Sequence, residues 1–190
     1  MSAAAAPPAP PALAGPAAER GAGTTVVGIG DVGFAVAGGP GPSRLATYAL
    51  GSCLGVALYD PVARVAGLLH VMLPASSTDP ARAAQSPAMF VDTGVPPLFK
   101  ECYRLGAVKE RLVVRVAGGA HQAECEADDL FQIGKRNLLA LRKLLWRNNV
   151  IVRAEAVGGA RVSRTLYLDA ATGALRVRAT GPDGTRDFLL

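Results

Sequence analysis

Cys53 and His70 are the residues of this chain whose types and spacing best fit a chemical site, since a thiol beside an imidazole can carry out nucleophilic acyl transfer. The segment between them has the pattern of a β-hairpin, with two apolar runs on either side of residues 60–63. Asp at the first of these positions and Pro at the second are typical of a type I turn. This turn would place Cys53 directly opposite His70, with their Cβ atoms about 4.5–5.5 Å apart. A turn of odd length would instead send the two side chains to opposite faces.

Three residues close to Cys53 complete the candidate site. Gly51 and Ser52 let a substrate approach the backbone closely, and the amide of Cys53 can join an oxyanion hole. A catalytic base usually needs a third group to orient it, and the hydroxyl of Thr47 can return to the same rim of the sheet. The competing interpretation is that Cys53 and His70 are ordinary core residues and Thr47 an ordinary strand residue, because free cysteines are among the most buried residue types.

The remaining cysteines and the second histidine fit the chemistry less well. Cys125 stands between Glu124 and Glu126, whose charges would raise its pKa and disfavour the thiolate. Cys102 falls on the apolar stripe of an expected helix and is assigned to the core. His121 follows a Gly-Gly pair at the end of an expected strand, so it is the competitor to His70 as a base, with an exposed loop histidine as the alternative.

Composition limits the class of protein. The 190 residues are enough for one domain, and we place it at residues 23–190, after an Ala/Pro-rich tail at 1–22 that we expect to be disordered. No secretory signal or membrane span is recognised, and an odd number of cysteines favours a reducing cytoplasmic location. A net charge of +5 without a basic stripe is weak evidence for nucleic-acid binding and fits an acidic protein partner.

Cofactor and metal sites are not expected. There is no C-x-x-C pair, and His70 and His121 lack neighbouring ligands at metal-binding spacing. The Gly-rich segment at 28–31 is too short for a dinucleotide fingerprint, and no helix is expected after it.

The pattern predicts about seven strands and two helices, with the strands grouped in hairpins and the helices in the middle of the chain. This arrangement favours an α+β sandwich of mostly antiparallel sheets. A polar loop is expected at 74–87 and an acidic loop at 120–130. Apart from the hairpin around residues 60–63, strands are expected at 24–28, 32–37, 112–117, 150–157, 165–169 and 175–179, and helices at 89–106 and 133–147. The first helix contains Pro96 and Pro97, which favour a start near them.

The segment at 47–61, Thr-Tyr-Ala-Leu-Gly-Ser-Cys-Leu-Gly-Val-Ala-Leu-Tyr-Asp-Pro, resembles the signature of the CheD family of bacterial chemotaxis proteins. Further blocks continue the resemblance in the family's order over about residues 24–180. These blocks are His-Val-Met-Leu-Pro at 70–74, Phe-Val-Asp-Thr at 90–93, Ala-Gly-Gly-Ala at 117–120, Ile-Gly-Lys-Arg-Asn at 133–137 and Val-Gly-Gly at 157–159.

The resemblance implies a chemoreceptor glutamine deamidase. In that family a Cys–His–Thr set hydrolyses side-chain amides of receptor glutamines to glutamates, and Cys53, His70 and Thr47 occupy the matching positions. The implied fold is a three-layer α/β/β sandwich similar to the catalytic domains of deamidating toxins. The resemblance also implies the cytoplasmic helices of methyl-accepting receptors as partners, and a CheC-type phosphatase that approaches the same surface.

The chain departs from the family pattern at two places. Ala156 replaces an acidic residue before the Val-Gly-Gly block, and Ser163 replaces the Gly of a Gly-Arg-Thr sequence. Both lie away from the nucleophile in the sequence, so they bear on rim geometry and partner choice. Two other functions stay open: an adaptor that binds receptors or CheC without turnover, and a relative of cysteine proteases or transglutaminases.

Overall fold

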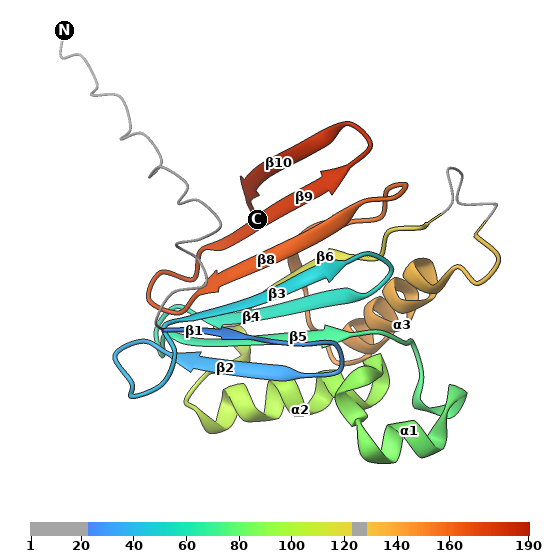
Figure 1. Cartoon of the computed structure of the whole chain (residues 1–190). Helices are drawn as coiled ribbons and strands as arrows, with labels where there is room; N and C mark the ends of the chain where they lie inside the picture. Colours follow the sequence, from blue (N-terminus) through green and yellow to red (C-terminus); the bar gives the residue numbers. More distant parts are fainter. Residues whose placement is uncertain (1–22, 123–128) are drawn as a thin grey trace, which may run out of the picture.

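A computed structural model describes residues 23–122 and 129–190 of the chain. The expected disordered tail at 1–22 and the acidic loop around Cys125 lie outside the described residues. The described part folds into two five-stranded sheets and two main helices, so the predicted α/β/β sandwich of mostly antiparallel strands is confirmed (Figure 1).

The sheet on the solvent side of the sandwich, here called the outer sheet, has the strand order β1-β3-β8-β9-β10. Its strands are antiparallel to their neighbours except for β1, which runs parallel to β3. Their bounds are β1 Thr24–Val26, β3 Arg44–Leu50, β8 Ser163–Asp169, β9 Leu175–Gly181 and β10 Gly184–Leu189.

The second sheet, here called the inner sheet, has the order β2-β5-β4-β6-β7 and lies between the outer sheet and the helices. Only β6 and β7 run parallel within it. Its strands are β2 Val32–Val36, β4 Leu54–Asp60, β5 Val65–Val71, β6 Val113–Gly118 and β7 Val152–Val157.

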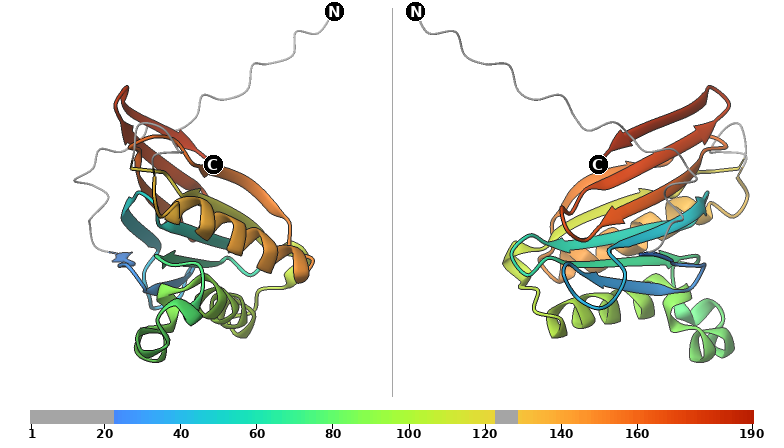
Figure 2. Two further views of the ribbon diagram at one scale, coloured as in Figure 1. Left: turned by 90° about the vertical axis from the view of Figure 1, so that its right-hand side faces the viewer. Right: turned by 60° about the vertical axis from the view of Figure 1, so that its left-hand side comes forward.

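Two helices cover the free face of the inner sheet and form the third layer, as the two turned views show (Figure 2). These are α2, Val91–Arg104, and α3, Ile133–Arg147. The short helix α1, Pro80–Gln85, and the 3₁₀ turns Ser76–Thr78, Pro87–Met89 and Lys109–Arg111 lie in the connections.

Alternation along the inner sheet separates two cores. In β4, Leu54, Val56 and Leu58 pack with the helices, whereas Ala57 and Tyr59 pack against the outer sheet. All seven residues of β4 and all seven of β5 are buried. A strand covered on both faces in this way reads as a continuous apolar run, so any polar side chain on it faces a dry layer.

Several expected elements differ from the structure. The described residues contain ten strands, more than the expected number of about seven, and the two with no counterpart among the expected ranges are β3 and β10. The polar loop expected at 74–87 contains α1, and α2 begins at Val91 with Pro96 and Pro97 inside it. Its first turn is fixed by packing and by the bond from the amide of Gly94 to the carbonyl of Phe90, so the two prolines do not set the start.

Candidate functional site

The candidate site lies where the chain crosses from one sheet to the other. Residues 51–53 join β3 of the outer sheet to β4 of the inner sheet. The pairing of β3 with β8 shifts between Thr47 and Leu50, and Ala49 has a left-handed φ of 58°. Such bulges bend a strand and often occur next to active sites, where they direct a side chain. Here the bulge turns the chain toward β4 just before Cys53.

Cys53 and His70 face the same layer of the sandwich. Cys53 packs against the core between the two sheets, together with Ala57 and Tyr59 of β4. His70 follows the alternation of Ala66 and Leu68, which belong to the same core. His70 is buried, with 1 % of its surface exposed, whereas Cys53 is partly exposed. The thiol is therefore the more accessible of the two groups.

The predicted register of the hairpin is wrong by one pleat. His70 pairs with Gly55, and Cys53 lies just before the first residue of β4, so the two are diagonal neighbours. Asp60 pairs with Val65, which leaves four residues in the loop, and Arg64 takes a left-handed φ of 51°. The twist of a type I turn does not match that of two strands joined by a two-residue loop. The left-handed residue Arg64 restores the match, and the strands pair from Val65 onward. Because the shift is even, both side chains keep the same face.

The imidazole of His70 is held by Thr47 across the two sheets. Oγ1 of Thr47 lies 2.8 Å from Nδ1 of His70 and donates its hydrogen to the carbonyl of Val27 at 2.7 Å. A carbonyl only accepts, and a hydroxyl has one hydrogen, so Thr47 must accept from His70. Nδ1 therefore carries the proton, and Nε2 is the free acceptor. Nε2 is buried and has no hydrogen-bond partner among the described residues.

Burial keeps both groups uncharged. It lowers the pKa of His70 to about 4, although the nearby charge of Asp31 acts in the opposite direction. It also raises the pKa of the Cys53 thiol above its usual range, and a hydrogen bond from the backbone of Cys53 itself partly offsets this. No hydrogen bond joins the thiol and the imidazole in the described structure. The resting pair is thus a neutral thiol and a neutral imidazole.

The backbone of residues 51–53 is fixed through its carbonyls. The carbonyl of Gly51 accepts from the amide of Ala120, and that of Cys53 accepts from the amide of Gly119. The carbonyl of Ser52 accepts from the side chain of Asn137. Within the described part of the chain, no acceptor is hydrogen-bonded to the amide of Ser52, and the only one near the amide of Cys53 is its own sulfur. Both amides can donate to a ligand.

Gly55 and Gly118 give the site its close packing. A Cβ on Gly55 would meet the side chains of Leu166 and Leu50 at 2.5 and 2.8 Å. Gly118 has a φ of 113°, and a Cβ there would overlap the carbonyl of Cys53. These two glycines allow the strands on both sides of the loop of residues 51–53 to approach it.

Two groups at the site were missed from the sequence: the carbonyl of Val27 and the side chain of Asn137. Nothing in the sequence indicates that the backbone carbonyl of Val27 accepts the hydrogen bond of Thr47. Asn137 did leave a signal, because it is a polar residue on the buried stripe of α3, with Leu141 and Leu145. The neighbouring Leu138, although apolar, is only half-buried.

The other two described candidates, His121 and Cys102, are placed differently. His121 lines a cavity of about 150 Å³ with Asp129 and Gln132, and none of Thr47, Cys53 and His70 lines it. The amide of the preceding residue, Ala120, donates to the carbonyl of Gly51, so His121 lies close to the loop of residues 51–53. Cys102 lies on the buried face of α2 and is completely enclosed in the core, and burial raises its pKa to about 12. Within residues 23–122 and 129–190, no group of three or more side chains suited to a metal ion is found.

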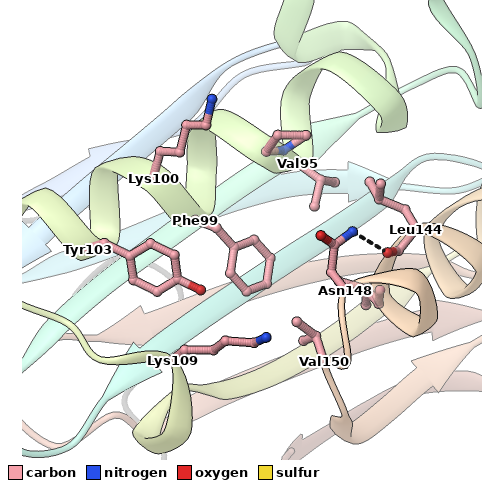
Figure 3. A pocket seen from close by; sticks show the side chains of 10 residues that line it. Val95, Phe99, Lys100, Tyr103, Lys109, Leu144, Asn148 and Val150 are labelled. Carbon is pink, nitrogen blue, oxygen red and sulfur yellow. Dashed lines mark hydrogen bonds between the residues drawn. The ribbon is translucent and has the colours of Figure 1, made fainter.

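An apolar groove of about 320 Å³ lies between α2 and the end of α3, on the helical layer (Figure 3). Val95, Phe99 and Tyr103 of α2 line one side, and Leu144 lines the other. None of the candidate site residues lines this groove. No helix among the described residues is long and apolar enough to cross a membrane.

The fold and site together define an α/β/β sandwich protein with a thiol and a hydroxyl-oriented imidazole in the layer between its sheets. Comparison with known proteins gives the family. The family described as "CheD chemotactic sensory transduction" matches residues 72–179, beginning just after His70. The chain belongs to the CheD family.

Curated relatives extend the match over most of the chain. A protein of Syntrophus aciditrophicus named "Probable chemoreceptor glutamine deamidase CheD 1" is 46% identical over 84% of this chain and 96% of its own length. A "Probable chemoreceptor glutamine deamidase CheD" of Solibacter usitatus is also 46% identical, over 82% of this chain and 89% of its own. One from Pyrococcus abyssi is 43% identical over 80% and 89%.

Proposed function

We propose that this protein is a chemoreceptor glutamine deamidase, in which Cys53 is the nucleophile, His70 the general base and Thr47 the residue that orients the base. The observation that carries the proposal is the hydrogen-bond chain from His70 through Thr47 to the carbonyl of Val27. It fixes the tautomer of the imidazole and leaves Nε2 as an acceptor in the layer that Cys53 also faces. The family membership supplies the substrate class.

The first half of the reaction forms a thioester. Nε2 of His70 accepts the proton of the Cys53 thiol as the sulfur attacks the side-chain carbonyl carbon of a glutamine. The oxyanion that forms accepts hydrogen bonds from backbone amides of the nucleophile loop, residues 51–53, including that of Cys53. The tetrahedral intermediate collapses, His70 donates its proton to the nitrogen, and ammonia leaves.

The second half releases glutamate. Water attacks the thioester while Nε2 of His70 accepts one of its protons. The proton then passes to the departing sulfur of Cys53, which restores the neutral pair. Each turnover replaces an amide with a carboxylate, so the receptor gains one negative charge and the enzyme is unchanged. Gly51 and Ser52 would contact the substrate, since both are half-buried beside Cys53.

The partners follow from this substrate. The target glutamines belong to the cytoplasmic helices of methyl-accepting receptors, so we place the protein in the cytoplasm. A CheC-type phosphatase is a second proposed partner and would approach the same face as the receptor. The net charge of +5 favours an acidic protein surface in both cases.

Mass spectrometry of receptor cytoplasmic fragments tests the proposal. After incubation with the protein, particular glutamine-containing peptides should gain about one dalton, with a matching release of ammonia. Cys53→Ala should abolish both signals while receptor binding persists, because the substitution removes the nucleophile and little volume.

His121→Ala is the matched control for His70→Ala. The first variant should keep the activity and the second should lose it, because only His70 is oriented by Thr47. Unchanged receptor masses where binding is demonstrated would overturn the deamidase and favour an adaptor. Cleaved peptides or incorporated amines would instead indicate a protease or a transglutaminase.

A further inference from the structure

Asn137 of α3 joins the loop that carries Cys53 to the residue that directly follows β5, the strand that carries His70. Its side chain is completely buried. Nδ2 donates to the carbonyl of Ser52 at 3.0 Å and to the carbonyl of Met72 at 2.9 Å. Both partners are carbonyls, so the nitrogen of the amide must face them. One side chain thus contacts the residue before the nucleophile and the second residue after the base.

Only the nitrogen of the Asn137 side-chain amide has hydrogen-bond partners among the described residues. Oδ1 of Asn137 is buried without a hydrogen-bond partner among the described residues, and an unsatisfied buried acceptor costs about 1–3 kcal/mol. Leu141 and Leu145, one and two turns further along the same face, show that an apolar residue fits this stripe. The two donated hydrogen bonds are therefore the feature that distinguishes Asn137 from a packing residue.

A close contact at the start of α3 brings Asn137 into reach. Gly134 lies against the chain just after β6, where a Cβ would meet the carbonyl oxygens of Gly119 and Ala120 at 2.5 and 2.7 Å. Gly119 and Ala120 in turn donate their amides to the carbonyls of Cys53 and Gly51. Gly119 and Ala120 thus contact both the start of α3 and the nucleophile loop.

The bond to Ser52 determines where the amide of Cys53 points. The described chain contains no cis peptide, so the carbonyl of Ser52 and the N–H of Cys53 point in opposite directions across one planar unit. Because Asn137 holds the carbonyl, the N–H is turned away from α3. Apart from the sulfur of Cys53 itself, no acceptor in the described structure takes this N–H.

We propose that Asn137 is a positioning residue that locks the Ser52–Cys53 peptide, so that the amide of Cys53 is aimed at the oxyanion of the reaction. This inference rests on the proposed function. Asn137 lies in the third layer and does not itself donate to the oxyanion; it controls the direction of the amide that does. Without Asn137 the peptide can rotate, and the donor is lost while the thiol and the imidazole remain.

The test compares two rates in Asn137→Asp and Asn137→Ala. Deamidation requires the oxyanion donor, so kcat should fall on the order of 10²–10³-fold with KM changed by less than about threefold. Alkylation of Cys53 by iodoacetamide passes through no oxyanion and depends on the thiolate. In Asn137→Ala, which adds no charge near the thiol, the alkylation rate and its dependence on pH should stay within about twofold of the wild type.

Asn148→Ala is the matched control, since Asn148 at the other end of α3 donates to the carbonyl of Leu144 and is exposed (Figure 3). It should keep both rates. Folding is checked in the same experiment, because Cys102 is fully buried and must stay unmodified in a native variant.

Two results would overturn the inference even though the wild type deamidates. One is an unchanged kcat in folded Asn137→Asp and Asn137→Ala. The other is an equal loss of kcat and of Cys53 alkylation, which would place the effect on the thiol. A wild-type chain that deamidates nothing would instead remove the proposed function, and this inference with it.

Discussion

The hydroxyl of Thr47 decides which nitrogen of His70 carries the proton. Because its only hydrogen goes to Val27, the imidazole must donate from Nδ1 and accept at Nε2. A neutral, buried imidazole and a neutral, partly exposed thiol then face the same layer, in contrast to sites where a thiolate–imidazolium pair is already formed. In the proposed reaction, proton transfer from Cys53 to His70 therefore has to accompany attack on the substrate.

Thr47→Val should lower kcat by about 10²-fold, because valine keeps the shape of threonine but leaves both tautomers of His70 accessible. Thr47→Ser keeps the hydroxyl and should retain most of the activity. Ammonia release from a receptor fragment measures both variants. Equal activity in the valine and serine variants would contradict the orienting role.

The activity should form a broad plateau with pH. Below the pKa of His70, about 4, the imidazole is protonated and cannot accept the thiol proton, so kcat/KM falls as the pH drops through that value. At alkaline pH kcat/KM should fall again, because the ionised thiol has no proton for His70 to pass to the departing ammonia. This fall should lie above the ordinary cysteine value of about 8.5, since burial raises the pKa of Cys53. Initial rates from pH 3.5 to 10 measure both limbs. An acid limb near 6.5 would show an exposed, ordinary histidine.

At the level of elements, the hairpin of β4 and β5 shows how far the sequence alone leads. Its two strands and the Asp-Pro turn could be predicted from local pattern, and so could the shared face of Cys53 and His70. The register could not, because it depends on the left-handed residue Arg64. The contact between Thr47 and His70 joins two different sheets, and no local pattern specifies how sheets stack.

The two missed strands have separate physical reasons. In β3 the bulge at Thr47–Leu50 interrupts the alternation that marks a strand. β10 is an exposed edge strand with little apolar pattern. Its turn did carry a signal, since Pro182 and Asp183 lie between Gly181 and Gly184, which pair. Asn137 was likewise visible as a polar residue on an apolar stripe.

Asp60→Asn should destabilise the protein by about 2–4 kcal/mol. The carboxylate of Asp60 is fully buried and accepts from the amides of Val62, Ala63 and Val108 and from the guanidinium of Arg111. These donors hold its pKa at about 2. An amide nitrogen in place of either oxygen would face a donor.

Urea unfolding measures this loss, and Asp183→Asn in the exposed turn before β10 is the control that should change little. An Asp60 variant as stable as the control would show that the turn does not depend on the carboxylate.

At the level of the whole molecule, buried arginines tie the layers together. Arg115 of β6 in the inner sheet donates to the carbonyl of Gly173, in the turn between β8 and β9 of the outer sheet, at 2.6 Å. It also donates to a backbone oxygen of Leu190 at 2.9 Å. Burial lowers its pKa. Arg164 of β8 similarly donates to Gly158 at the end of β7.

Arg115→Ala should therefore cost about 2–4 kcal/mol, because two carbonyls lose charged donors and a cavity forms between the sheets. Arg153→Ala on the neighbouring strand β7 is the control, since Arg153 is exposed. Thermal and urea unfolding of both variants measure the difference. A loss no larger than that of the control would show that the sandwich does not depend on this arginine.

The hydrogen bond between Thr47 and His70 has a consequence for how the activity is lost on heating. Its two ends belong to different sheets, so a slight parting of the layers breaks it while every strand stays paired within its own sheet. The imidazole of His70 can then rotate, and in the proposed mechanism it no longer acts as an oriented base. Deamidation should accordingly be lost on gentle warming before the circular dichroism of the secondary structure changes. The activity would then report a change in the spacing between the two sheets earlier than the secondary structure does.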